Sequence, residues 1–498
     1  MISYRVISPK DNVAVALENI SHGTNISYHN QIIIIDEDIK KGHKFAIEEI
    51  KKDSKIIKYG SPIGYAIKNI KKGSWVHTHN VHTLLGDELE YQYNPVPIPK
   101  LNEQENRTFF GYERLNGKVG IRNDLYIIPS VGCINPLLDI VVSQFKSLHP
   151  DNGAFDNIIV LKHPYGCSQL GDDFEQTRNI LVDAALHPNA GAVLFFGLGC
   201  ENNQISGIKK LLYENDQFDR KRFKFLIAQE VDNEFETALK MLEELNDVAS
   251  HDKRSKQPIS KLSIGLKCGG SDGLSGITAN PLLGKATDYF VSQGGSVILS
   301  EVPEMFGAEQ QLMNRAESEN VFNEVVDLIN DFKKYFESYG QPIYENPSPG
   351  NKEGGITTLE DKSLGCTQKA GTSSVVDVLK YGEKIKKSGL SLLQSPGNDL
   401  VASSAEAAAD CQIILFTTGR GTPFAPFVPT IKVSSNSEIH DKKPWWIDFD
   451  AGRLLDNSME SLSKEFIDDI ISVASGKRTN NEKFNIHGLA IFKNGVTE

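Results

Sequence analysis

Two histidines stand two residues apart in the run 75–80, which the sequence predicts to be a β-strand. Successive strand side chains point to opposite faces, so His77 and His79 are expected to share one face. Two imidazoles on one face can bind a transition metal or exchange protons, and His43 upstream is a candidate for a third. The alternative is that both rings lie on a solvated face of the sheet. The two histidines alone do not distinguish a functional site from a solvated face.

Five of the six cysteines lie in or beside polar, glycine-containing turns, namely Cys133, Cys167, Cys200, Cys268 and Cys366. Ligands of open α/β sheets bind beyond the carboxyl ends of the strands, where such turns converge. Thiolates suit iron and other soft-to-borderline metals, and a thiol can also act as an acid or base. For each cysteine the alternative is a small buried apolar filler, and we assign Cys411 to the core outright.

A glycine-rich loop at 269–276 offers many backbone N–H groups to an anionic or polyhydroxylated ligand. It lacks the spacing of a phosphate-binding loop, so we do not expect ATP hydrolysis there. The turn at 197–199 begins like a dinucleotide fingerprint, but Asn203 stands where its third glycine belongs. The polar connection 346–362 is long enough to predict a functional loop, with a solvated linker as the alternative.

The chain has 498 residues, which predicts two to four domains. Residues 1–95 alternate short apolar runs with turns and are predicted to form a small β domain. A proline-rich linker, 96–107, follows. From 108 onward, apolar strands lead into glycine-rich turns and amphipathic helices, which predicts an α/β body with mostly parallel sheets. A charged segment at 251–257 divides this body into an α/β domain at 108–250 and a C-terminal α/β domain at 251–498.

The balance of 53 basic and 65 acidic side chains gives a net charge of −12, and no long basic run interrupts it. Nucleic acid and anionic membranes are therefore not expected as partners. The N-terminus has no secretory signal and no stretch approaches the length of a membrane helix, so we expect a cytoplasmic protein. The six cysteines contain no CxxC pair and are expected to be reduced thiols.

Over essentially its whole length the chain resembles the sugar-acid dehydratase family that contains altronate and galactarate dehydratases. The resemblance is carried by segments in all parts of the sequence: 11–17, 42–46, 58–60, Tyr165-Gly166-Cys167-Ser168-Gln169, Gly197-Leu198-Gly199-Cys200-Glu201-Asn202-Asn203, 268–281, Glu304-Met305-Phe306-Gly307-Ala308-Glu309, 346–369 and 417–423. It implies an SAF-type fold for the N-terminal β domain and a family-specific α/β body. It also implies a hydro-lyase that converts D-altronate to 2-dehydro-3-deoxy-D-gluconate in hexuronate (galacturonate) breakdown, with Fe²⁺ or another divalent metal such as Mn²⁺.

Dehydrating such an acid requires removal of the C2 proton, loss of the C3 hydroxyl, and neutralisation of the negative charge that develops on the carboxylate. A divalent metal on the carboxylate would do the last. As catalytic candidates we take His77, His79, His43 and Lys369. As metal ligands we take Cys167, Cys200 and Cys268, in competition with His77 and His79. As binders of the polyol and carboxylate we take Arg122, Asn123, Ser271, Asp272, Asn280 and Arg420, the last with a surface ion pair as its alternative.

Three rival functions remain open from the sequence. The first is dehydration of another sugar acid such as galactarate, because one contact can set the preference between similar substrates. The second is a sugar-acid-binding protein without turnover, and the third is a nicotinamide-dependent oxidoreductase, which the imperfect glycine fingerprint disfavours. The oligomeric state is also left open, with a homo-oligomer among the alternatives.

Overall fold

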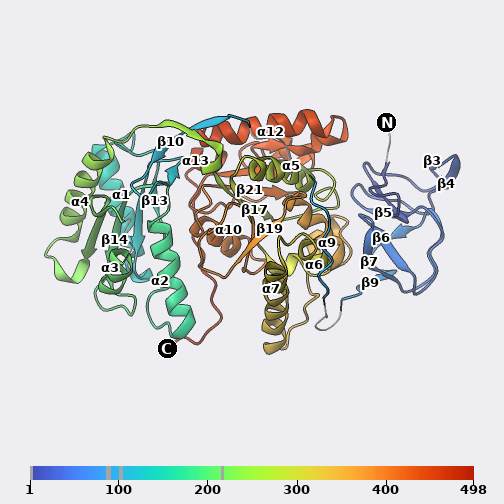
Figure 1. Cartoon of the computed structure of the whole chain (residues 1–498), viewed down its shortest axis with the longest axis horizontal. Coiled ribbons are helices and arrows are strands. Elements are labelled where there is room, and N and C mark those ends of the chain that lie inside the picture. Colours follow the sequence, from blue (N-terminus) through green and yellow to red (C-terminus); the bar gives the residue numbers. More distant parts are fainter. Residues whose placement is uncertain (1–3, 86–90, 100–104, 215–217) are drawn as a thin grey trace.

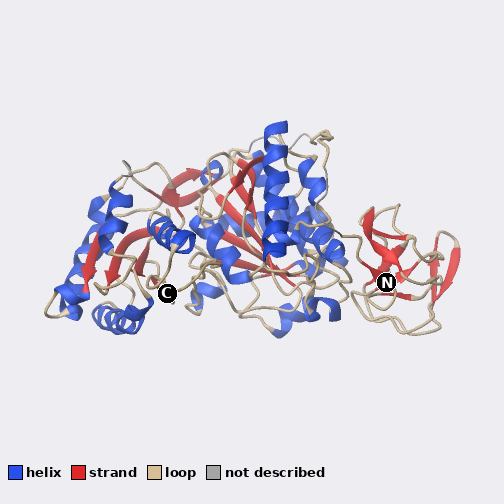
Figure 2. Ribbon diagram, turned by 90° about the horizontal axis from the view of Figure 1, so that it is seen from below, coloured by secondary structure: helices blue, strands red, loops and turns tan. Residues whose placement is uncertain are grey.

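The protein folds into three domains arranged in a row, with the C-terminal domain in the middle (Figure 1). The computed structural model describes residues 4–85, 91–99, 105–214 and 218–498. Figure 2 shows that the N-terminal domain consists of strands and loops, whereas helices flank the sheets of the other two. This arrangement confirms the predicted fold class, a small β domain followed by a larger α/β body.

The N-terminal domain is built from short antiparallel strands. One sheet has the order β1-β2-β5-β8, a hairpin joins β3 to β4, and a third sheet has the order β6-β7-β9. The bounds are β1 Tyr4–Arg5, β2 Val13–Ala16, β3 Asn25–Tyr28, β4 Gln31–Ile34, β5 Lys44–Ala46, β6 Lys55–Lys58, β7 Ser61–Ala66, β8 Trp75–Val76 and β9 Val81–His82. Every residue of β2 is buried, whereas in β4 Ile33 is buried and Ile32 and Ile34 are exposed. The predicted small β domain is confirmed.

The second domain contains a four-stranded parallel sheet of order β13-β12-β14-β15. Its strands are β12 Asp124–Pro129, β13 Ile158–Val160, β14 Ala190–Gly197 and β15 Phe223–Ile227, and its helices are α1 Asn135–Leu148, α2 Gly171–Ala185, α3 Ile205–Tyr213 and α4 Glu234–Ala249. The charged segment taken as a boundary contains β16 (Ser255–Pro258), which pairs antiparallel with β10 (Thr108–Glu113). β10 also pairs with β11 (Val119–Gly120).

The C-terminal domain is organised around a seven-stranded parallel sheet of order β19-β20-β18-β17-β21-β22-β23. Its strands are β17 Ser263–Cys268, β18 Ser296–Leu299, β19 Val375–Leu379, β20 Gly389–Leu393, β21 Ile413–Thr418, β22 Thr430–Ser434 and β23 Phe449–Asp450. Chain order reverses between the neighbours β17 and β21, which marks a topological switch point, where ligands of such sheets bind. Ser391 and Lys432 interrupt the apolar runs of β20 and β22.

The helices of the C-terminal domain are α5 Ala279–Ser292, α6 Glu309–Met313, α7 Glu319–Ser338, α8 Pro349–Glu353, α9 Leu359–Cys366, α10 Asp399–Ala408, α11 Ser437–Lys442, α12 Met459–Ala474 and α13 Asn480–Lys483. One apolar cluster is shared between this domain and the second, because side chains such as Tyr126 and Phe195 pack with Phe416 and Phe427. The two α/β domains therefore form one continuous body.

The N-terminal domain docks on α9, all of whose residues are buried. Asp361 on this helix accepts hydrogen bonds from Lys44 Nζ at 2.8 Å and Lys58 Nζ at 2.9 Å, and all three side chains are almost fully buried. Burial alone would raise the pKa of Asp361, but the two ammonium groups lower it, so the carboxylate stays ionised. The backbones also meet, because a Cβ added to Gly273 would lie 1.9 Å from Gly42 O.

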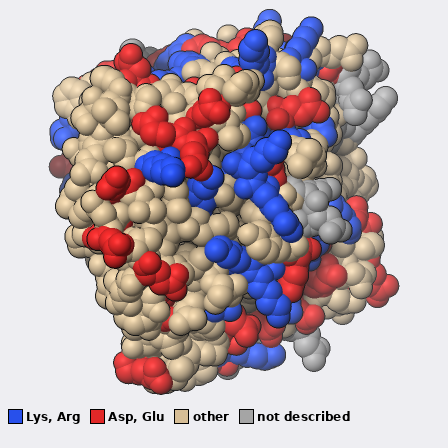
Figure 3. Space-filling view, turned by 90° about the vertical axis from the view of Figure 1, so that its left-hand side faces the viewer, with Lys and Arg blue, Asp and Glu red and all other residues tan. Residues whose placement is uncertain are grey.

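No helix in the described part of the chain is long and apolar enough to cross a bilayer. Figure 3 shows the outer face of the second domain, where acidic and basic side chains are interspersed. This face therefore presents no extended surface of one charge.

Replacing Asp361 by Asn should destabilise the protein by about 3–5 kcal/mol, because two buried ammonium groups would lose their counter-charge. The matched control is Asp468→Asn, which breaks the half-exposed pair with Arg107 and should cost less than about 1 kcal/mol. Urea unfolding followed by circular dichroism measures both. Equal losses in the two variants would show that the buried carboxylate does not hold the domains together.

Candidate active site

A cavity of about 600 Å³ lies at the carboxyl edge of the seven-stranded sheet. Its walls come from the turn after β17, the segments that follow β18 and β20, the loop before α8, and α9. The lining residues that could bind or transform a ligand are Cys268, Glu304, Asn346, Ser348, Asn351, Lys352, Lys362, Asn398 and Asp399. A chemically rich cavity beside the switch point is the best candidate for an active site.

A lysine and glutamate network lies beneath the cavity floor. Lys267, inside β17, pairs with Glu301 and is 2.9 Å from Asp399 Oδ1. Lys369 Nζ lies 3.5 Å from the other oxygen of Glu301. Burial and the nearby Glu304 carboxylate raise the pKa of Glu301 to about 7. Burial opposes the charge on Lys369, but Cys268 and Glu301 raise its pKa, so it remains an ammonium group.

Helix α9 contributes a second charged pair on the side that faces the cavity. Lys362 Nζ is 2.8 Å from Glu304 Oε1 and donates to Asn346 Oδ1 at 3.1 Å. Cys366, one turn later, donates its thiol proton to Glu304 Oε2 at 3.1 Å. Burial opposes the charge on Glu304, yet the surrounding ammonium groups lower its pKa to about 2. The cavity thus holds an ionised carboxylate beside lysine charge.

Cys268 and Cys366 are the two buried thiols of the site. Interaction with Cys366 lowers the pKa of Cys268 to about 5 against the opposing effect of burial. Interaction with Cys268 and burial raise the pKa of Cys366 well above its usual value. Ser271 Oγ lies 2.6 Å from the Cys268 sulfur. The lowered pKa favours the thiolate form of Cys268, and this residue lines the cavity.

The histidine prediction needs correction. Strand β8 ends at Val76, and the next residues form a turn in which Asn80 N–H donates to His77 O. His77 is buried against the C-terminal domain, with Nδ1 3.1 Å from Thr357 Oγ1, whereas His79 is exposed. Their predicted common strand face does not exist. The rings of both instead pack on Trp75, at 5.2 and 5.0 Å between centroids.

The structure does bring His43 close to His77, with ring centroids 5.1 Å apart. Trp75 Nε1 donates to His43 Nδ1 at 3.2 Å, which leaves the proton of the neutral ring on Nε2, facing Glu353 O at 3.0 Å. Burial lowers the pKa of both histidines, that of His77 to about 3. Both nitrogens of His43 are thus already engaged at the interface between the domains.

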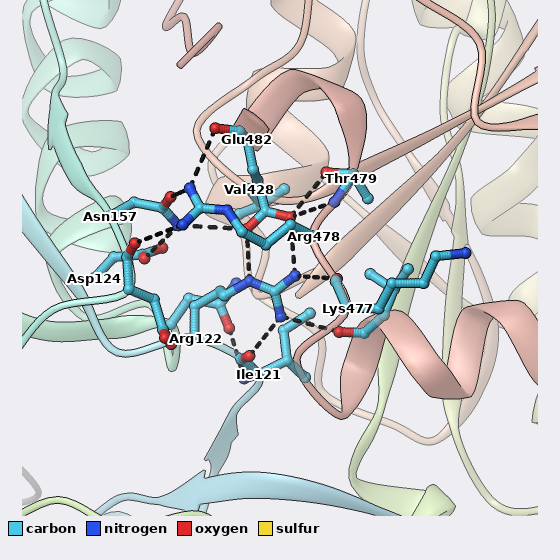
Figure 4. A network of polar contacts seen from close by, with 12 residues as sticks. Ile121, Arg122, Asp124, Asn157, Val428, Lys477, Arg478, Thr479 and Glu482 are labelled. Atoms are coloured by element: carbon cyan, nitrogen blue, oxygen red, sulfur yellow. Dashed lines mark hydrogen bonds and ion pairs between the residues drawn. The ribbon is translucent and has the colours of Figure 1, made fainter. Parts of the chain in front are cut away.

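Arg122 and Asn123 do not line the cavity; they directly precede β12 and have structural partners, and Figure 4 shows those of Arg122. The Arg122 guanidinium binds both carboxylate oxygens of Glu482 and donates to the carbonyls of three further residues, Ile121, Val473 and Lys477. All its N–H donors are used. Asn123 accepts from Arg114 and donates to Ala154 O. Arg122 and Asn123 are therefore engaged within the fold, and the substrate-binding roles expected of them stay predictions without support from their position.

Among the other predicted binders, only Ser271 touches the candidate site. Asp272 accepts hydrogen bonds from Ser275 and Ser435 and so holds its own loop in shape. Asn280 bridges Gly365 O and the Thr417 hydroxyl. Arg420 is exposed, pairs with Glu353 at 3.0 Å and lines a separate cavity of about 230 Å³ together with Asp272. For Arg420 the sequence analysis gave a surface ion pair as the alternative to substrate binding. The structure contains that ion pair.

The cysteines predicted as metal ligands are divided between two domains, and His77 and His79 lie in the third. Cys268 is buried in the C-terminal domain, whereas Cys167 and Cys200 are exposed in turns of the second. Across the described residues no group of three or more His, Cys, Asp or Glu side chains is placed to hold one metal ion. In the cavity, the carboxylates of Glu304 and Asp399 already bind lysine ammonium groups. The residues present do not fit a mononuclear site with three protein ligands.

Comparisons with known proteins find matches along the whole chain. Family models match in three consecutive parts: the altronate/galactarate dehydratase SAF domain at 2–84, the second domain of D-galactarate dehydratase/altronate hydrolase at 111–250, and the C-terminal domain of D-galactarate/altronate dehydratase at 259–497. The altronate dehydratases of Bacillus subtilis (strain 168) and Escherichia coli (strain K12) are 54% and 51% identical, over all of both chains. The galactarate dehydratase (L-threo-forming) of Escherichia coli (strain K12) is 32% identical, over 98% of this chain and 96% of its own.

The chain belongs to the altronate/galactarate dehydratase family. As a member of this family it is an enzyme of the hydro-lyase type, and its N-terminal β domain is an SAF domain.

Sequence reasoning missed four charged residues of the site in this dehydratase family member, namely Lys267, Glu301, Glu304 and Lys362. One signal could have found the first two. Lys267 interrupts the apolar strand β17, and Glu301 follows the apolar strand β18, so each was bound to be buried near a strand end. A buried charge needs a partner of opposite charge, and Lys267 and Glu301 are partners of each other.

Cys268 should be alkylated by iodoacetamide with a midpoint near pH 5, because the thiolate is the nucleophile and is present above the pKa. In Cys366→Ala the midpoint should rise toward about 8.5, the value of an ordinary thiol. Mass spectrometry of tryptic peptides measures both rates, and the fully buried Cys411 should stay unlabelled in the native protein. A wild-type midpoint near 8.5 would contradict the interaction of the two thiols.

Proposed function

We propose that the protein dehydrates D-altronate to 2-dehydro-3-deoxy-D-gluconate in the cavity at the end of β17. The substrate assignment rests on the two altronate dehydratases, whose identity to this chain far exceeds that of the galactarate dehydratase. The reaction assignment is supported by one observation above all: the Cys268 thiolate lines a cavity whose walls and floor carry lysine ammonium groups.

Removing the C2 proton of an aldonate creates negative charge on the neighbouring carboxylate, and the site has to stabilise it. Lys362 lines the cavity and Lys369 lies buried close to Cys268, so positive charge is already in place before reaction. Preorganised charge in a site that excludes water lowers the barrier without any reorganisation. Lys362 would bind the carboxylate, and Lys369 would stabilise the charge that develops from it.

The Cys268 thiolate is the proposed base. It accepts the C2 proton, the electron pair of that bond forms the C2–C3 double bond, and the C3 hydroxyl departs. The removed proton can leave with that hydroxyl as water, and the resulting enol becomes the 2-keto acid. Cys366 holds Cys268 in the thiolate form, which makes it a positioning residue in this scheme.

The polyol part of the substrate fits the remaining lining of the cavity. Asn346, Ser348, Asn351 and Asn398 line it with neutral donors and acceptors. Ser348 Oγ donates to Asn351 Oδ1, and Asn346 Oδ1 accepts from Lys362 Nζ. Amide and hydroxyl groups can both donate to and accept from sugar hydroxyls. This lining suits a chain of hydroxyl groups that carries one carboxylate.

Four further expectations are also proposals. The dependence on Fe²⁺ or Mn²⁺ and the place of the reaction in galacturonate breakdown are implied by the family resemblance. A cytoplasmic location is proposed because the relatives of the chain are enzymes of sugar-acid metabolism. The catalytic and metal-binding roles of His77 and His79 stay predictions, with His77 the better placed of the two because it is buried beside Lys44 and Asp361.

Anaerobic incubation of the protein with D-altronate should produce a 2-keto acid without any nicotinamide. kcat/KM for altronate should exceed that for galactarate about 100-fold, because a second carboxylate would meet neutral amides rather than a cation. Semicarbazide absorbance measures the keto acid. Equal kcat/KM values for altronate and galactarate would contradict the altronate assignment. Binding without turnover would favour a sugar-acid-binding protein.

Lys369→Met should lower kcat roughly 100- to 1,000-fold with a much smaller change in KM, because its charge is needed mainly in the transition state. Lys464→Met is the matched control, since Lys464 is exposed on α12 and should leave both constants unchanged. Circular dichroism checks that both variants fold. An unchanged kcat in the folded Lys369 variant would remove this lysine from the mechanism.

A further inference from the structure

Three cysteines outside the cavity end up at one edge of the second domain. Cys133, Cys167 and Cys200 each follow one of the neighbouring parallel strands β12, β13 and β14, close to its carboxyl end. All three are exposed free thiols, whereas the other three cysteines of the chain are buried. Exposed thiols are reactive and usually rare on a surface, so three in adjacent turns call for an explanation.

The three turns are joined to one another by backbone hydrogen bonds. Gly132 N–H donates to Tyr165 O at 2.8 Å, and Asn203 N–H donates to Gly166 O at 3.0 Å. Ser168 N–H donates to Asn202 Oδ1 at 3.0 Å. Each of these contacts lies within three residues of two of the cysteines, so the thiol-bearing segments form a single interlocked surface.

Buried polar side chains fix these turns from below. Glu201 accepts hydrogen bonds from Ser130 Oγ and Gly199 N–H, both at 2.5 Å. Asn203 Nδ2 donates to Ser130 O at 3.1 Å. Glu201, Ser130 and Asn203 are all buried. A carboxylate and an amide are thus buried to hold the turns in place, while the thiols above them remain accessible.

We propose that Cys133, Cys167 and Cys200 bind an iron–sulfur cluster through three thiolates. The described side chains include no three ligands placed around one ion. A cluster has no such requirement, because each thiolate binds a different iron atom. Helices α1, α2 and α3 begin shortly after the three cysteines, and the positive ends of their dipoles favour an anionic group at this edge.

The sheet that carries the three cysteines contacts the sheet of the candidate active site. Asn189 Nδ2, just before β14, donates to Gln412 O, just before β21, at 3.2 Å. Three thiolates leave one iron of a [4Fe–4S] cluster without a cysteine, and such an iron binds oxygen ligands such as carboxylates or hydroxyls.

The test is anaerobic purification of the full chain, followed by reconstitution with ferrous iron, inorganic sulfide and dithiothreitol. Iron and acid-labile sulfide are measured per chain, together with the visible absorption of bound cluster. The wild type should retain both elements in near-equal amounts. Single Cys→Ser variants at 133, 167 and 200 should each lose most of them, whereas Cys411→Ser should retain them.

Melting curves identify any variant that fails to fold, and exposed positions should tolerate serine. Three results would overturn the proposal: a wild type that retains no more iron and sulfide than the triple serine variant, a wild type that binds zinc without sulfide, or cluster that survives in all three single variants. None of these readouts depends on turnover. Loss of altronate activity and loss of the cluster are therefore distinguishable.

Discussion

The ion pairs that bury Asp361 between Lys44 and Lys58 are the constraint on which the rest of the structure depends. Two lysines of the SAF domain and one aspartate of α9 are buried together, and among the described residues none of the three forms an ion pair with any other side chain. Such a group is stable only in one arrangement, because removing any member leaves an unpaired buried charge. The SAF domain is thereby fixed against a helix that also forms a wall of the active-site cavity.

Helix α9 connects the buried ion pairs of Asp361 with the candidate active site. Asp361 points toward the SAF domain, while its neighbour Lys362 and Cys366 one turn later face Glu304. The same eight residues therefore hold two domains together, present the Lys362 cation to the cavity and place the Cys366 thiol on Glu304. These groups need a rigid helix, because a hydrogen bond such as that from Cys366 to Glu304 forms only over a narrow range of distances.

The cysteines of this chain occupy three environments with different consequences. Cys411 is packed in the core, Cys268 and Cys366 are buried among lysines, and the remaining three are exposed on interlocked turns. Their sequence contexts are nearly alike, since five of the six stand beside glycine and polar residues. What differs is the charge and solvent around the sulfur, which decides whether a thiol is inert, a base or a metal ligand.

The sequence by itself determined the domain classes, the main parallel strands and the family, because alternating and continuous apolar runs reflect local geometry and long motifs are specific. It also placed Cys268, Ser271 and Lys369 at the site. Only the tertiary structure showed that Arg122 and Asn123 serve the fold, that His77 and His79 lie on a turn, and that Glu301, Glu304, Lys267 and Lys362 meet. These facts depend on which charges become neighbours after burial, and the neighbours come from strands and turns far apart in the chain. The spacing of residues along the sequence does not predict such pairings.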